Sequence, residues 1–98
     1  MAFIQIIEMK TSKLDELTAL EEEWKKATEG KRTLRRSIIT RDRNNPSRYL
    51  ILAFFDSYES AMQNSNLPET AAFGEKQAAL LDAPPNFFDL DVLEDDGS

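Results

Sequence analysis

The sequence predicts an α+β fold of the ferredoxin-like, split β-α-β kind, in which helices cover one face of a four-stranded antiparallel sheet. Three observations lead to this prediction. Four short apolar segments alternate with two segments of helical periodicity, so the element order is β-α-β-β-α-β. A short turn-rich loop joins the second and third apolar segments, which favours a hairpin. Right-handed crossovers then give the strand order 4-1-3-2.

The first strand and the first helix are predicted in the N-terminal third of the chain. Ala2–Lys10 is apolar and rich in isoleucine, and Ser12 with Asp15 three positions later resembles a capping box at a helix start. Gly30 suits the C′ position that ends this helix. One charged residue, Glu21, interrupts the apolar helical repeat. The positions of the repeat are Leu14, Leu17, Leu20 or Glu21, Trp24 and Ala27.

The predicted hairpin carries most of the positive charge. Its strands are Thr33–Arg41 and Arg48–Phe55, and its loop is Asp42–Ser47. Seven of the 12 basic residues lie between Lys31 and Arg48, although the net charge is -6. The acidic balance argues against nucleic-acid binding. The basic segment indicates either an anion site or a solvated hairpin that pairs with acidic surface elsewhere.

A broken helix follows the hairpin. Tyr58 to about Ser65 is predicted helical, with Asp56 or Ser57 as its N-cap. The chain then breaks at Asn66-Leu67-Pro68. Pro68 restarts it as a helix that continues to about Asp82, because proline is favoured at the first helical position.

The last strand is predicted at Asn86–Leu93, after the helix stop Ala83-Pro84-Pro85. We expect one domain over residues 1–94 and an acidic flexible tail over 95–98. No apolar run is long enough to span a membrane, and the N-terminus does not read as a signal peptide. The sequence has no cysteine, which excludes a disulfide framework and suits a cytoplasmic location.

The apolar faces of the sheet predict a homodimer. The third strand is apolar on both faces from Leu50 to Phe55, whereas helices can cover only one face. A second sheet packed on the other face would close a dimeric barrel; the alternative is a monomer with an open apolar face. The edge strands would place Arg35 and Arg36 of one copy near Asp89 and Asp91 of the other.

The segment Arg48–Phe73, RYLILAFFDSYESAMQNSNLPETAAF, resembles the antibiotic-biosynthesis-monooxygenase-like family of small dimeric α+β barrels. The likeness covers nearly the whole chain and is greatest to bacterial members with a segment similar to Tyr58–Thr70. It implies a cavity between the helices and the sheet of each subunit. It also implies that quinol-like or anthrone-like aromatics could be oxidised by molecular oxygen without a cofactor. Haem-degrading relatives use a histidine, and this chain has none.

Several polar and aromatic side chains are candidates for a ligand site. Asn64 and Asn66 could donate hydrogen bonds at the mouth of the pocket, or they could simply terminate the helix. Trp24 with Phe73 could stack on an aromatic ligand, or both could belong to the core. The Tyr58 hydroxyl could contact a ligand, or the ring could pack on the sheet.

Gln5 and Ser37 are polar residues within apolar strands, and each needs a hydrogen-bond partner. That partner could be a ligand or water in the pocket, or a group across the dimer face. Asp89 or Asp91 could supply a buried carboxylate base, or could pair with arginine at a subunit edge. No spacing matches a nucleotide loop or a metal site, so neither a cofactor nor a metal is expected.

The expected function is the binding of a small aromatic molecule, with cofactor-independent monooxygenation as the activity that the resemblance implies. No residue is assigned as catalytic. The alternative is a non-catalytic ligand-binding or stress-associated dimer that kept the fold without the chemistry. A third interpretation is a structural dimerisation module, whose pocket would be filled by Phe54, Phe55 and Phe73.

Overall fold

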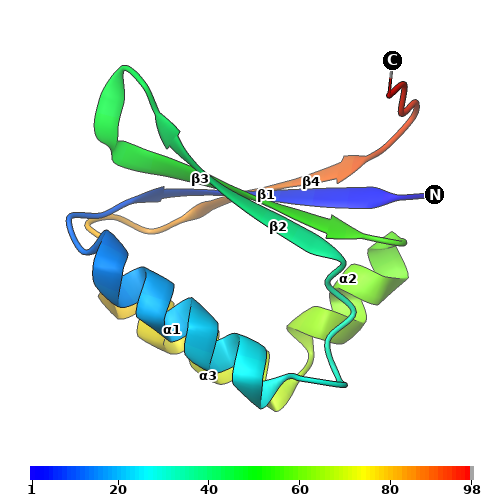
Figure 1. Cartoon of the computed structure of the whole chain (residues 1–98), viewed down its shortest axis with the longest axis horizontal. Coiled ribbons are helices and arrows are strands. Elements are labelled where there is room, and N and C mark those ends of the chain that lie inside the picture. The colour runs from blue at the N-terminus through cyan, green and yellow to red at the C-terminus, as the bar shows by residue number, and fades with distance from the viewer. Residues whose placement is uncertain (98) are drawn as a thin grey trace.

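The computed structural model describes residues 1–97, and it has the predicted fold class. The sheet is antiparallel with the order β2-β3-β1-β4, which confirms the predicted strand order 4-1-3-2 (Figure 1). Three helices lie on one face of it, because the second helical region is broken in two. The elements are β1 (Phe3–Lys10), α1 (Leu14–Ala27), β2 (Arg36–Asp42), β3 (Asn45–Phe55), α2 (Tyr58–Ser65), α3 (Pro68–Ala79) and β4 (Asn86–Asp91).

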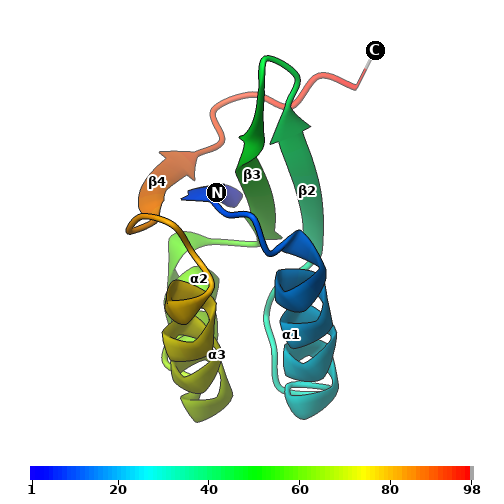
Figure 2. The same cartoon turned by 90° about the vertical axis from the view of Figure 1, so that its left-hand side faces the viewer.

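The helical layer has two parts. Figure 2 shows α1 on one side, under β2 and β3, and α2 and α3 on the other side, with the sheet above all three. The Ser57 hydroxyl caps α2 by accepting the Ser60 N–H at 3.0 Å. Leu67 is the N-cap of α3 and Pro68 is its first residue, as the sequence predicted. The break at Asn66–Pro68 therefore lets the chain turn from α2 into α3 beneath the sheet.

The start of α1 differs from the prediction. Lys13 is the N-cap and makes no side-chain capping bond, so the capping box of Ser12 and Asp15 is wrong. The Thr11 hydroxyl instead accepts the Lys13 N–H at 2.9 Å and donates to the Leu80 carbonyl at 2.7 Å. A buried threonine thus ties the β1–α1 turn to the end of α3. Gly30 has the positive φ of 80° expected of it, but Thr28 is the C-cap, so Gly30 lies one position beyond C′.

Strand boundaries also differ from the prediction. β2 begins at Arg36 rather than Thr33, because the Thr33 hydroxyl donates to the Ser60 carbonyl of α2 instead of extending the strand. β3 begins at Asn45, so the predicted loop shrinks to a tight turn at Arg43 and Asn44. The last helix and the last strand end earlier than predicted, at Ala79 and Asp91. Of the predicted tail 95–98, Ser98 lies outside the described residues, and the division at residue 94 stays a prediction.

The core lies between the sheet and the helices. Alternate strand residues point to opposite faces, and the buried ones on the helix-facing side are Phe3, Met9, Tyr49, Ala53 and Phe55. From the helices, Ala61 of α2 packs in one cluster with Phe3, Ala53 and Phe55, and Leu17 and Trp24 of α1 are also buried. The Phe3 and Phe55 rings lie side by side, with centroids 6.4 Å apart. These contacts fix the height of the helical layer beneath the sheet.

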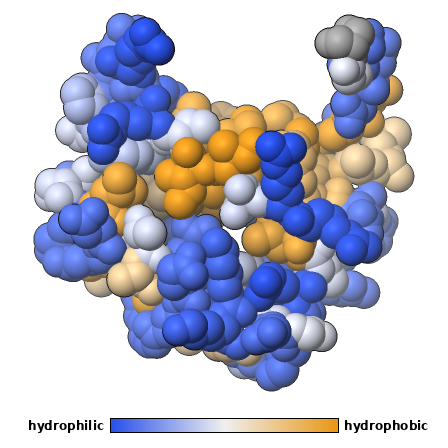
Figure 3. All heavy atoms as spheres, in the orientation of Figure 1, coloured by the Kyte–Doolittle hydropathy of each residue, from blue (hydrophilic) through white to orange (hydrophobic). Residues whose placement is uncertain are grey.

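The opposite face of the sheet is apolar and is covered by no helix. Figure 3 shows this hydrophobic surface along the sheet, above the hydrophilic helical layer and between two raised hydrophilic ends. Phe88 and Leu90 of β4 are 47% and 44% exposed there. We call this surface the open face; its apolar residues are Ile4, Ile6, Ile38, Leu50, Leu52, Phe54, Phe88 and Leu90. Within residues 1–97, no helix is long and apolar enough to cross a membrane.

Candidate functional site

A hollow of about 110 Å³ lies between the sheet and the helices. Its lining residues come from β1, β2, β3, α1, α2 and α3 and from the loop before β2. The strands line the side of the hollow that faces the sheet, and the helices line the opposite side. The apolar part of the wall comes mainly from Ile7, Leu34, Ile51, Ala53 and Phe55. Asn64 and Ser65 line it at the end of α2. The hollow is where the family resemblance placed a cavity, and Phe54, on the open face, is not part of its lining.

Two aromatic rings form one wall of the hollow. Trp24 of α1 and Phe73 of α3 have centroids 5.9 Å apart and planes inclined by 44°. The Trp24 Nε1 donates to the Thr70 hydroxyl oxygen at 3.0 Å, which holds the indole in place. Trp24 therefore belongs to the core and also faces the hollow, so its two interpretations are compatible. A flat ligand could lie against this wall.

Two buried side-chain amides line the hollow with hydrogen-bonding capacity to spare. Asn64 is 7% exposed, and its Oδ1 accepts the Thr33 N–H at 3.3 Å, while its Nδ2 donates to no described residue. Gln77 is also 7% exposed, and its side-chain amide bonds to none of residues 1–97. Among the described residues, Glu69 Oε1 is the fully buried side-chain atom without a hydrogen-bond partner, so the unbonded Asn64 and Gln77 amide atoms keep some accessible surface. Both groups are therefore available to a polar atom inside the hollow.

Glu21 is the only charged residue among the described ones that line this hollow. It comes from α1, and Ser37 of β2 lines the hollow with it. Burial raises the pKa of the Glu21 carboxyl; Lys25 and the Ser37 hydroxyl lower it, and Glu22 raises it. A narrow extension of the hollow continues under α1, and Glu21 and Gln77 line both parts. The site thus combines a carboxylate, two amides and an aromatic wall.

The remaining predicted site residues divide into two groups. Gln5 lines the hollow, and its Nε2 donates to the Asp89 carboxylate at 3.1 Å, so Asp89 is engaged at the sheet edge. Ser37 lines the hollow together with Glu21. Asn66 is the exposed C-cap of α2 and lies outside the lining. Tyr58 is 48% exposed and stacks edge-on against Phe3 at 5.5 Å, also outside it.

Sequence reasoning named five residues that the fold brings together: Gln5, Trp24, Ser37, Asn64 and Phe73. It missed Glu21 and Gln77. Glu21 had a signal, because it is the one charged residue in the apolar repeat of α1. Gln77 had none, because a glutamine in a helix is ordinarily exposed.

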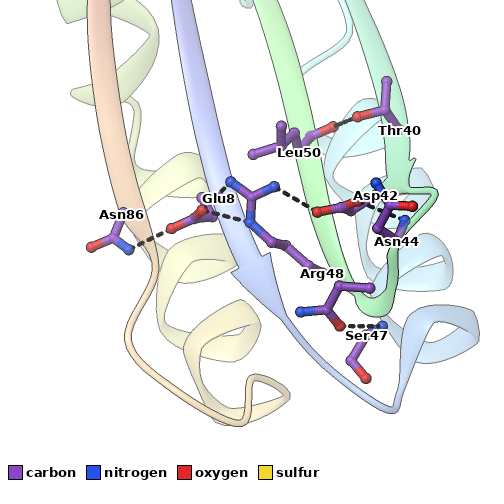
Figure 4. Close-up of polar contacts among 9 residues, drawn as sticks. Glu8, Thr40, Asp42, Asn44, Ser47, Arg48, Leu50 and Asn86 are labelled. Carbon is purple, nitrogen blue, oxygen red and sulfur yellow. Dashed lines mark hydrogen bonds and ion pairs between the residues drawn. The ribbon is translucent and has the colours of Figure 1, made fainter.

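Three of the seven basic residues between Lys31 and Arg48 pair with carboxylates of the described residues. Arg35 contacts Asp56, and Lys31 contacts Glu69 at 2.6 Å. Arg48 lies between the Glu8 and Asp42 carboxylates (Figure 4). These pairs favour the interpretation of a hairpin that pairs with acidic surface over that of an anion site.

The pairing around Arg48 crosses all four strands. Asn86 of β4 donates to Glu8 of β1 at 2.7 Å, and Arg48 of β3 donates both to Glu8 and, at 3.0 Å, to Asp42 of β2. The Asn86 and Arg48 hydrogen bonds lower the pKa of the Glu8 carboxyl. The Asn44 backbone N–H and Arg48 lower that of Asp42. We call these four residues the strand-crossing network; it lies at one end of the open face (Figure 4).

Comparison with known proteins shows the fold. No family model and no curated protein matches the chain. Among solved structures, SnoaB, a cofactor-independent oxygenase from Streptomyces nogalater crystallised as a mutant, aligns with a TM-score of 0.82 at 9% identity, over 99% of this chain and 98% of that one. Rv0793 from Mycobacterium tuberculosis aligns at 0.78 and 15% identity over 100% of both chains.

A further solved structure carries the activity in its name. This antibiotic biosynthesis monooxygenase aligns with a TM-score of 0.73 at 9% identity, over 96% of this chain and 100% of that one. The chain has the antibiotic biosynthesis monooxygenase fold. At such low identities the likeness establishes the fold. Residues 1–97 contain no group of three or more acidic, histidine or cysteine side chains placed to hold a metal.

Proposed function

We propose that this protein binds a small aromatic molecule in the hollow and oxidises it with molecular oxygen, without a cofactor. The observation that carries the proposal is the pair of buried amides, Asn64 and Gln77, which face an aromatic-walled hollow with unused hydrogen-bonding capacity. Such donors hold a phenolate or enolate oxygen. The name of SnoaB, a cofactor-independent oxygenase of the same fold, adds support from outside the chain.

The proposed oxidation needs few protein groups. A ring carbon para to the hydroxyl group becomes a carbonyl: one atom of O₂ stays on that carbon, and the other leaves as water with the hydrogen of that carbon and the hydroxyl hydrogen. Four electrons pass from the ring to dioxygen, which reacts with the substrate anion. The hollow would exclude bulk water and hold that anion with the Asn64 and Gln77 N–H groups.

The size of the hollow limits the ligand. A closed apolar cavity of about 150 Å³ accommodates benzene, so the hollow of about 110 Å³ encloses less than one free ring. A bound ring would therefore not be wholly enclosed, and the rest of a larger molecule would lie outside the hollow. We therefore propose a single-ring aromatic, or one ring of a larger molecule, as the bound part.

We further propose that the protein acts as a homodimer joined through the open face. No helix among residues 1–97 covers the eight apolar side chains of that face, and a second copy would bury them. The strand-crossing network gives the face a polar end, which would stop it from sliding freely on a partner. At the edges, Arg35 is already paired with Asp56. Arg36 of β2, opposite Phe54 on the open face, would meet the second copy, whereas Asp91, opposite Phe3, lies on the helix-facing side.

The alternative function is non-catalytic binding of the same class of molecule. The small volume of the hollow favours it, because a buried single ring would leave little room for dioxygen beside it. Both functions require an open hollow. A structural dimerisation module would instead have its pocket filled by side chains, so the hollow disfavours that interpretation.

Oxygen uptake distinguishes the two functions. We would incubate the purified dimer with a panel of hydroquinones and anthrone-like aromatics, without added cofactor or metal, against boiled protein. Saturable uptake that is lost in Asn64→Ala and retained in Asn66→Ala would support the oxygenase. No uptake across the panel, with saturable ligand binding, would leave the binding protein.

A further inference from the structure

The Glu21 carboxylate lies where burial makes its charged form unfavourable. It lines the hollow and its narrow extension, and every other residue that lines either part is uncharged. A leucine there would continue the apolar repeat of α1 and pack against Ile51 and Phe73. Because burial penalises the charged form of a carboxylate, a residue kept at this cost has a use for its charge.

The groups around Glu21 are arranged to serve a ligand rather than to neutralise the charge. No cation from β1, β2, β3, α2 or α3 lines the hollow, and the charged neighbours are Lys25 and Glu22 of α1 itself. The Ser37 hydroxyl lines the same hollow and lowers the pKa of the carboxyl, as the smallest of its influences. The unpaired amide of Gln77 borders the same two spaces. A proton acceptor and an oxyanion donor therefore face one small volume.

We propose that Glu21 is the proton acceptor of the hollow, so that the site selects neutral rings with an acidic hydroxyl group over rings that arrive as anions. In the step, the O–H bond of the bound phenol breaks and its electron pair stays on the ring oxygen. The proton forms a new O–H bond on the Glu21 carboxylate. One negative charge moves from Glu21 to the phenolate, whose oxygen then accepts the Asn64 and Gln77 N–H groups.

This step deepens the proposed function, on which it rests, because dioxygen reacts with the electron-rich phenolate rather than with the neutral phenol. A general base of this kind contributes about 10²–10⁴ in rate. Burial that raises the pKa of Glu21 also makes it a stronger base than a solvated carboxylate. A carboxylate ligand such as benzoate would instead bring a second negative charge beside Glu21, and like charges at this range repel strongly.

The test compares phenol and benzoate, two rings of similar size. Trp24 is the only tryptophan of the chain and lines the hollow, so its fluorescence reports binding. In the wild type we expect phenol to bind and benzoate to bind poorly, with benzoate improving as the pH is lowered through the raised pKa of Glu21. In Glu21→Gln we expect phenol to weaken by about tenfold, as for loss of a charge-assisted hydrogen bond. Benzoate should strengthen there and lose its pH dependence.

Matched variants separate this role from a structural one. Glu16→Gln changes an exposed carboxylate of the same helix and should leave both affinities unchanged. Glu21→Asp keeps the charge and should restore discrimination against benzoate. If Glu21→Gln binds both probes as the wild type does, the proposal is overturned.

Oxygen uptake keeps this inference distinct from the proposed function. Uptake that persists undiminished in Glu21→Gln would overturn the role of Glu21 and leave the oxygenase standing. No uptake by the wild type, with the benzoate and phenol preferences exchanged in Glu21→Gln, would overturn the oxygenase and leave Glu21 as the proton acceptor of a binding site.

Discussion

The indole Nε1 of Trp24 donates a 3.0 Å hydrogen bond to the hydroxyl oxygen of Thr70, which joins α1 to α3 at the wall of the hollow. Trp24 is buried, so its N–H has no ready access to water if that oxygen is removed. The bond therefore contributes to the stability of the helical layer as well as to the position of the aromatic wall.

Thr70→Val should destabilise the protein by about 1–2 kcal/mol, because it leaves the buried Trp24 N–H without an acceptor at nearly constant volume. The free energy of unfolding in urea, followed by tryptophan fluorescence, measures this. Thr18→Val is the matched control: its hydroxyl bonds within α1 at an exposed position, so a change within about 0.5 kcal/mol is expected. Equal losses of unfolding free energy in the two variants would show that the Trp24–Thr70 hydrogen bond adds no stability beyond that of an exposed hydroxyl bond.

Glu21→Gln should make the protein more stable at pH 7. Burial raises the pKa of Glu21 in the folded state, so its ionisation opposes folding once the pH exceeds the ordinary value of 4.5. The wild type should thus lose stability relative to the variant as the pH rises from 4.5 through the raised pKa. Melting temperatures of both proteins between pH 4 and 8 check this. A variant less stable than the wild type at pH 7 would contradict it.

Arg48→Met should remove acid-sensitive stability. The pKa values of Glu8 and Asp42 are lowered in the folded state, so their contribution is present above the ordinary values and is lost as the pH falls through the lowered ones. Carboxylates ordinarily titrate between about pH 5 and pH 3. We expect the free energy of unfolding of the wild type to decline over this range, and that of the variant to decline less. Denaturant titrations at several pH values measure the difference. Arg43→Met, at the exposed hairpin turn, should leave the decline unchanged.

Leu52→Glu should convert the proposed dimer to a monomer. Leu52 lies opposite Ile6 and Ile38 in the middle of the open face, so a charge there would be buried against the second copy. Sedimentation at micromolar concentration gives the mass. Ala19→Glu, an equivalent change at an exposed position of α1, should remain dimeric. A wild type that sediments as a monomer would refute the proposed assembly.

The fold could be predicted because its signals are local. The order of apolar strands and helical segments follows from neighbouring residues. The same holds for the proline at the start of α3 and for the tight hairpin. The errors arose where tertiary contacts intervened. Ser12 looked like a cap, but the neighbouring Thr11 hydroxyl takes the N–H and anchors to Leu80. Thr33 looked like strand, but it bonds to α2.

The candidate site was harder to predict for the same reason. Asn64 could be anticipated from its place at a helix end, and Glu21 was visible as an interruption of an apolar repeat. Gln77 could not be anticipated, because only the packing of α3 under the sheet turns an ordinary helical glutamine into a buried one. Its lack of a partner is a property of the tertiary structure alone.

The most direct test of the account is a phenol titration of the wild type and Gln77→Leu, followed by Trp24 fluorescence. The account predicts that the variant binds phenol about tenfold more weakly, having lost a donor to the ligand oxygen. Equal affinity for phenol, with the fold intact, would contradict the claim that the unpaired amides of the hollow hold a ligand.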